Sequence, residues 1–170
     1  MGLDILKETG ASRTPGSNVL AGEEIMPGFV MLMEDAETIK VYDDKAEIPS
    51  GLAMQSNVHY PAFDPAAPDG TPVGDGYEFL NYNRGGLIGL FRAGGTVLLY
   101  DDKRKSGGAS HPVDYSQAYA VNGICYADET TGKITSDSAT GTRKEVGIVE
   151  KVVGSGADLV LKMRLSGTLA

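Results

Sequence analysis

The chain has 170 residues, a length that suits one ordinary domain with a hydrophobic core of its own. It carries 23 acidic and 15 basic residues, for a formal net charge of −8. This balance argues against nonspecific nucleic-acid binding, because phosphate contacts need a basic face. Glycine is frequent, with 23 residues, and few stretches show helical periodicity. Frequent glycines with little helical periodicity predict an all-β fold of many short strands.

The single cysteine, Cys125, lies in an apolar run of strand length. A disulfide framework is therefore excluded, and we expect a buried free thiol that packs as a small apolar side chain. No apolar run is long enough to span a bilayer, so no membrane partner is expected. The first residues lack the basic and apolar regions of a secretory signal, which predicts a protein made in the cytoplasm and not exported by the usual route.

Residues 1–18 are predicted to form a flexible N-terminal arm ahead of a β domain that spans 19–170. The second half of the arm is small, polar and glycine-rich, and such a segment cannot bury enough apolar surface to offset its ordering entropy. The apolar residues before it, Leu3, Ile5 and Leu6, suggest an extended anchor that orders against a partner. A frayed terminus explains the same composition equally well.

The first predicted strands of the β domain are short and apolar. Residues 29–33 and 39–42 are expected to pair as a hairpin, with Met31 and Met33 filling the core from one face. A further strand is expected over 50–58. Strands this short, bounded by glycine and proline turns, fit one compact β-barrel or β-sandwich of antiparallel strands.

A pair of apolar runs, 87–91 and 96–100, flanks a glycine-containing break at 92–95. We predict a central hairpin here, because paired glycines supply the positive φ angles of a tight antiparallel connection. Residues 77–83 alternate aromatic and polar side chains and are expected to form a half-buried strand leading into it. A last strand with one solvent-facing side is predicted within 158–165.

Two long loops are predicted, at 61–76 and 103–112. The first is proline-rich and cannot be a central strand, since proline lacks the ladder donor. Phe63 within it is a candidate partner contact if exposed, or a lid on the core if folded back. The second loop begins with the chain's only basic cluster: Lys103, Arg104 and Lys105. A solvated loop explains this cluster, and a docking point for an acidic partner surface is the alternative.

The sequence also contains a weak internal repeat. The order of a glycine-led apolar strand, an acidic turn, a short strand around isoleucine and a return through glycine occurs twice. The distance along the chain from Gly28 to Ile39 equals that from Gly123 to Ile134. We therefore predict two related β-meanders and not a solenoid, which needs at least three units. The segments are 28–35, 39–44 and 50–53, then 123–129, 133–137 and 146–149.

Residues with catalytic or metal-binding chemistry are sparse. His59 and His111 are far apart and show no metal-ligand spacing, and no nucleophile elbow or phosphate-binding loop is present. The aspartate pairs at 43–44 and 101–102 each follow a tyrosine at a strand end, where acidic turn residues are routine. We predict no catalytic, metal or cofactor site, and a protein that is not an enzyme.

Four stretches together resemble the small capsid decoration, or cement, proteins of tailed bacteriophages. The resemblance is one of pattern over about residues 19–166, and the loops at 61–76 and 103–112 depart from it. The stretches are Ala-Gly-Glu-Glu-Ile-Met-Pro-Gly-Phe-Val-Met-Leu, Ser-Gly-Leu-Ala, Gly-Gly-Thr-Val-Leu-Leu-Tyr-Asp and Glu-Val-Gly-Ile-Val-Glu.

The resemblance implies a structural virion protein on the outside of an expanded phage head. Such proteins are commonly homotrimers that bridge major capsid protein subunits against internal DNA pressure. The expected contact residues are Leu3, Ile5, Leu6, Phe63, Lys103, Arg104 and Lys105. Two alternatives stay open: another virion β module, such as a tail, fibre or carbohydrate-binding domain, and an enzyme that uses the aspartate pairs.

Overall fold

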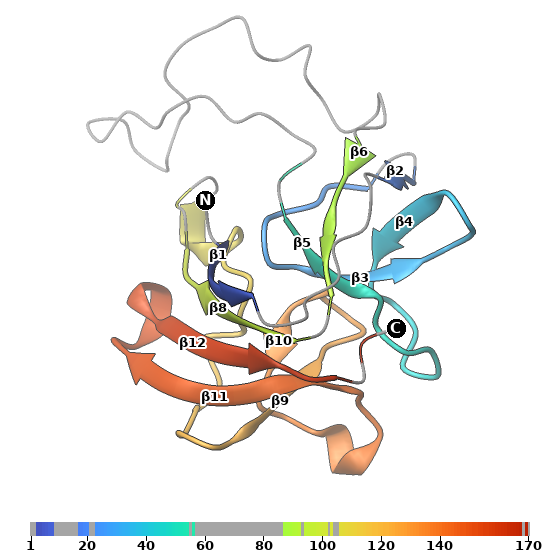
Figure 1. Cartoon of the computed structure of the whole chain (residues 1–170). Coiled ribbons are helices and arrows are strands. Elements are labelled where there is room, and N and C mark those ends of the chain that lie inside the picture. Colours follow the sequence, from blue (N-terminus) through green and yellow to red (C-terminus); the bar gives the residue numbers. More distant parts are fainter. Residues whose placement is uncertain are drawn as a thin grey trace, which may run out of the picture.

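The computed structural model describes residues 3–8, 17–20, 23–54, 56, 87–92, 94–101, 103, 106–167 and 169; for 3–8, 17–19, 87 and 106 it describes the backbone only. These residues form two six-stranded sheets, with three short 3-10 turns and no longer helix among them (Figure 1). The predicted all-β fold is confirmed.

The first sheet, sheet A, occupies the lower left of Figure 1. All of its strand pairs are antiparallel. Its order is β1 (Leu3–Glu8), β8 (Gly95–Leu99), β12 (Val160–Leu165), β11 (Glu145–Val153), β9 (Ile124–Ala127) and β10 (Ile134–Thr135).

The second sheet, sheet B, occupies the upper right of Figure 1 and contains one parallel pair, β2 with β4. Its order is β6 (Leu87–Ile88), β2 (Ser17–Val19), β4 (Thr38–Val41), β3 (Val30–Met33), β5 (Gly51–Ala53) and β7 (Leu90–Phe91).

Sheet B closes on itself. Strands β6 and β7 stand at opposite ends of its strand order, yet only Gly89 separates them in the chain. Ile88 pairs with β2 and Phe91 pairs with β5, while the Gly89 carbonyl accepts a 3.0 Å hydrogen bond from the Met54 amide. Residues 87–91 therefore act as one bent strand that joins the two ends of the sheet.

The predicted central hairpin is wrong, although both of its strands exist. Strand β7 pairs with β5 in sheet B, whereas β8 lies between β1 and β12 in sheet A. The chain changes sheets at the glycine-containing break, where Gly94 has φ +94°. A glycine with positive φ suits a corner between two sheets as well as it suits a hairpin turn, so the sequence pattern could not separate the two.

The predicted internal repeat is confirmed by the strand order. In one unit β3 lies between β4 and β5, and in the other β9 lies between β10 and β11. The equivalence extends to the segment before each unit, because Val19 pairs in parallel with Ile39, and Val113 bridges in parallel to Ile134. The next hydrogen bond matches too. The amide of residue 20 donates to Ile39, and that of residue 114 donates to Ile134, both at 2.8 Å.

Two clusters of buried side chains explain why strands β3 and β5 of sheet B lack a polar face. Met31, Ile39 and Ile88 belong to a cluster inside closed sheet B, with Met33 packed against it. Val30 and neighbouring side chains of sheet B instead join a larger cluster shared with sheet A. Both faces of β3 and β5 are therefore buried, and the alternation of a half-exposed strand is absent.

Three further predictions are confirmed. The hairpin of 29–33 and 39–42 forms as β3 and β4, and Cys125 is fully buried. The last strand, β12, alternates buried with half-exposed or exposed residues. The strand predicted over 50–58 is shorter, because β5 ends at Ala53, and the one predicted at 77–83 lies outside the described residues.

Candidate functional site

The margins of the two sheets differ in how their backbone groups are satisfied. Sheet B has no free end, because residues 87–91 close it. At one end of sheet A, Ile134 of β10 donates to the Pro112 carbonyl at 2.9 Å and accepts from the Asp114 amide at 2.8 Å. At the other end, β1 follows β8 with no further strand among the described residues. Among the described residues, β1 is therefore the one sheet end with no neighbouring strand or closing segment.

Strand β1 belongs to the predicted arm and carries three of the expected contact residues: Leu3, Ile5 and Leu6. Leu3 lies opposite Leu99, and Ile5 lies opposite Val97. The register shifts between Ile5 and Lys7, so a bulge divides the strand after its first three residues. The arm predicted over residues 1–18 thus contains β1 of sheet A and the first two residues of β2 of sheet B.

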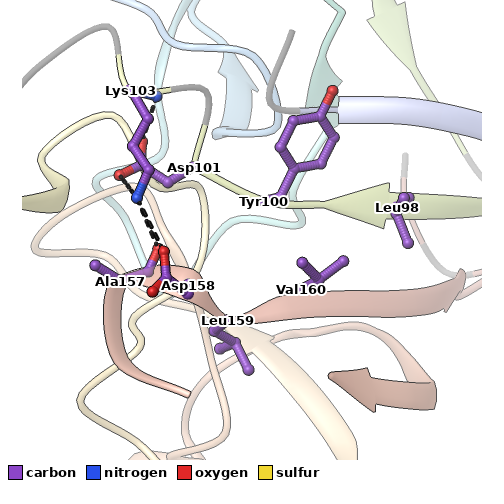
Figure 2. A pocket seen from close by; sticks show the side chains of 8 residues that line it. All are labelled: Leu98, Tyr100, Asp101, Lys103, Ala157, Asp158, Leu159 and Val160. Carbon is purple, nitrogen blue, oxygen red and sulfur yellow. Dashed lines mark hydrogen bonds and ion pairs between the residues drawn. The ribbon is translucent and has the colours of Figure 1, made fainter. Parts of the chain in front are cut away.

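A pocket of about 330 Å³ opens beside this margin, where β8 ends and β12 begins. Figure 2 shows apolar Leu98, Tyr100 and Val160 on one side of it, with Lys103 and Asp158 joined at the other end. The three apolar side chains are half-buried and come from neighbouring antiparallel strands or their ends. A pocket with an apolar wall and a charged rim suits a partner's side chain better than it suits proton-transfer chemistry.

Lys103, a predicted contact residue, forms the charged rim. Its backbone has a left-handed φ of +59°, and its amide donates to Asp101 Oδ1 at 3.0 Å. Its Nζ lies 3.3 Å from Asp158 Oδ1 and 3.5 Å from the Ala157 carbonyl oxygen. Because the Lys103 and Asp158 side chains are 57% and 88% exposed, this ion pair contributes little stability and can be exchanged for a partner's charges.

A buried cluster of Asp101, Ser110 and His111 has the composition of a catalytic triad but a structural geometry. Ser110 Oγ donates to Asp101 Oδ1 at 2.6 Å, while both ring nitrogens of His111 face backbone groups. The amide of Val113 donates to Nδ1 at 3.0 Å, so Nε2 carries the proton and donates to the Leu159 carbonyl at 3.0 Å. The imidazole has no nitrogen left for a substrate.

Arg143 anchors a second polar cluster, at the turns around β9 and β10. Its guanidinium contacts Asp128 Oδ1 at 2.9 Å, Glu129 Oε2 at 2.8 Å and Asp137 Oδ2 at 3.0 Å. The hydrogen bond from Arg143 is the main reason that the pKa of Glu129 is lowered. Three carboxylates around one guanidinium hold the β9–β10–β11 meander together, and this network is a structural one.

The aspartate pairs of the enzyme alternative are held in local contacts where the structure describes them. Asp43 pairs with Lys40 at 3.1 Å, and Asp44 Oδ1 accepts from the Ala46 amide at 2.8 Å in a turn. Asp101 is buried and accepts from Ser110 and from the Lys103 amide. Asp102 lies outside the described residues.

The structure brings together only some of the expected contact residues. Leu3, Ile5 and Leu6 share β1, and Lys103 lies at the rim of the pocket beside β8. Phe63, Arg104 and Lys105, like His59, lie outside the described residues. Sequence reasoning missed the apolar wall of the pocket, because its residues come from strands more than fifty residues apart and show only ordinary strand alternation.

Within the part of the chain that the structure describes, no group of three or more His, Cys, Asp or Glu side chains could hold a metal ion. The same residues contain no helix that is long and apolar enough to cross a membrane. No family model matches the chain, and no curated protein matches it either. Function is therefore inferred from the margin of sheet A, which we define as β1, β8 and the adjoining pocket.

Proposed function

We propose that the protein is a structural virion protein that binds the outer surface of a phage head and stabilises the lattice of the major capsid protein. The observation that carries this proposal is the edge of β1, beside which the described residues place no further strand. A strand at a sheet edge offers a row of backbone donors and acceptors to a partner strand. Leu3, Ile5 and Leu6 lie on that strand, and the apolar-walled pocket lies beside it.

Charge and polar chemistry support a binding role. The net charge of −8 keeps copies soluble and disfavours direct contact with packaged DNA. Lys103 adds an exposed cation at the rim of the pocket, where an acidic side chain of the capsid could replace Asp158. Among the described residues, the ionisable clusters around His111 and Arg143 are held in internal hydrogen bonds. We assign the protein no cofactor and no catalytic step.

Co-sedimentation with expanded heads that lack the protein tests this function. Purified protein should bind saturably, at a copy number commensurate with the capsid lattice. The same assay on a variant that lacks residues 1–8 should show loss of binding. That deletion spares β2, which a deletion of the whole predicted arm would remove from sheet B. Circular dichroism and the unfolding temperature of the variant show whether the rest of the chain is still folded.

Absence of saturable binding by the folded, full-length protein would contradict the proposal. A tail, fibre or carbohydrate-binding module would then be the better account, and binding to tail assemblies and to glycans would be measured next. The variant Lys103→Glu gives a second readout on the margin. It reverses the rim charge beside Asp158 and the buried Asp101 carboxylate, so the unfolding temperature of the variant is measured first. We expect it to weaken capsid binding while Lys162→Glu, on the same sheet but outside the pocket, has less effect.

A further inference from the structure

The edge of β8 beneath β1 differs from the edge of β1 itself. Strand β8 contains no charged residue, and its Val97 and Leu99 side chains are fully buried. Strand β1 contains Asp4, Lys7 and Glu8 and a bulge. Charges and bulges are devices by which natural sheets discourage indiscriminate edge-to-edge pairing, while a partner strand of matching charge and register can still add to such an edge. Without β1, the uncharged edge of β8 would be open to pairing with other strands. Strand β1 occupies that edge, and its own outer edge carries charges and a bulge that disfavour pairing with a second copy of β1.

Strand β1 is attached to the described part of the fold mainly through one other strand. Strand β8 is the one described element with which it packs extensively, through pairing of Leu3 to Glu8 with Leu99 to Gly95. The chain then continues to β2, which lies in the other sheet. Nothing in these contacts requires that the β1 covering a given β8 come from the same chain, since every copy carries an identical strand.

The connection between β1 and β2 is long enough to reach a neighbour. Residues 9–16 have the sequence Thr-Gly-Ala-Ser-Arg-Thr-Pro-Gly, with two glycines and one proline and no large apolar residue. Fully extended, the span from Glu8 to Ser17 reaches at most about 30 Å, which is comparable to the diameter of a small domain. A tether of this length lets β1 leave its own β8 and pair with that of an adjacent copy.

We propose that copies of this chain exchange β1, so that β1 of one copy pairs with β8 of the next. The same backbone bonds form in either arrangement, and exchange adds a link between copies. Each copy donates one strand and accepts one: reciprocal exchange between two copies gives a two-fold dimer, and exchange from each copy to the next closes into a ring when the rotation between copies permits. This inference goes beyond capsid binding and does not depend on it. A β1 from the same copy and a β1 from a neighbouring copy would cover β8 with the same residues.

Site-directed disulfides test the exchange directly. Asp4 and Leu98 are opposite each other in the β1–β8 register, and Leu98 is half-buried on the pocket side. Two full-length single variants, Asp4→Cys and Leu98→Cys, are tagged differently, mixed in denaturant, refolded together and oxidised. Exchange predicts covalent dimers that contain one chain of each kind, involving up to about half of the Asp4→Cys chains in an equal mixture.

Controls make every outcome decisive. The native Cys125 is fully buried and is present in all variants. Each single variant oxidised alone therefore measures the amount of dimer that forms without the cross-link between the two variants. Dimers of Asp4→Cys alone would show edge-to-edge pairing of β1 and overturn the proposal. An internal disulfide in the double variant Asp4→Cys/Leu98→Cys, without mixed dimers, would show that β1 stays on its own chain. Absence of both cross-links would show that β1 does not pair with β8 and would also overturn it.

Discussion

His111 Nε2 donates a 3.0 Å hydrogen bond to the backbone carbonyl of Leu159, the residue just before β12. This bond ties the segment before the second meander to the strand that follows it. In the first meander the equivalent segment, β2, is joined to the strand that follows the meander by backbone pairing, since Ser17 lies opposite Ile88 of β6. The connection between these two segments is thus made by a side-chain hydrogen bond in the second unit and by strand pairing in the first.

We predict that protonation of His111 destabilises the fold. Burial lowers the pKa of His111 below its usual 6.5, because desolvation disfavours the charged imidazolium more than the hydrogen bond to Leu159 favours it. The unfolded chain then binds more protons than the folded chain at mildly acidic pH. The contribution of His111 to the free energy of unfolding should be fully present above the unfolded-state pKa of about 6.5. It should be lost as the pH falls from there to the lower folded-state pKa. Chemical denaturation between pH 5 and pH 8 measures this slope.

The variant His111→Gln serves as the control for that slope. Its amide can donate to the Leu159 carbonyl but does not titrate, and it loses the acceptor for the Val113 amide. We expect lower stability at pH 8, by about 1–3 kcal/mol for the unsatisfied amide. The pH dependence near 6.5 should become flatter. An unchanged slope in this variant would assign the pH dependence to other groups.

A glycine at the tip of the β9–β10 hairpin is predicted to be essential for docking the two sheets. Gly132 has φ +68°, its carbonyl accepts a 2.8 Å bond from the Val30 amide, and a Cβ there would collide with Val41 Cγ1. Gly132→Ala should lower the free energy of unfolding by about 2–4 kcal/mol. Gly141→Ala has a similar φ, +84°, but open space around it, and should lose only about 1–2 kcal/mol. Equal losses would contradict the docking role.

The Cys125 thiol is predicted to be unreactive in the folded protein. Burial raises its pKa to about 12, so almost no thiolate exists at neutral pH, and its residue is fully buried. An aromatic disulfide reagent should label it at the rate of unfolding and stoichiometrically in denaturant. Rapid labelling of the native protein would show that β9 opens locally.

The Arg143 network is predicted to stabilise the second meander more than the exposed Lys103–Asp158 pair stabilises the pocket rim. The Arg143 side chain is 13% exposed and contacts three carboxylates. Arg143→Met should lower the free energy of unfolding by about 2 kcal/mol or more, because charged hydrogen bonds are lost and carboxylates remain without a partner. Lys103→Ala should change it by about 1 kcal/mol or less, although Nζ also lies 3.9 Å from the buried Asp101 carboxylate. Similar losses from both, measured by urea denaturation, would contradict this ranking.

Local pattern was sufficient to predict the parts of the fold that depend on neighbouring residues. The turn at residues 34–37 follows from an acidic side chain, because Asp35 Oδ1 accepts from the amides of Glu37 and Thr38 at 2.8 Å. Alternation predicted the exposed side of β12, and equal spacing predicted the second meander.

Features that depend on distant partners were not predictable from the sequence. The glycine break at 92–95 looks the same whether the next strand turns back or enters another sheet. His111 gave no signal for its role, because Leu159 lies 48 residues away. The pocket likewise combines ends of β8 and β12 that no local pattern relates.

The measurement that tests the central claim most directly is the temperature at which DNA-filled heads release their DNA. Heads stripped of the protein are compared with heads saturated with it, at fixed ionic strength. Our account predicts release at a higher temperature after saturation, and no gain with the variant that lacks residues 1–8. Saturable binding that leaves the release temperature unchanged would contradict a stabilising role.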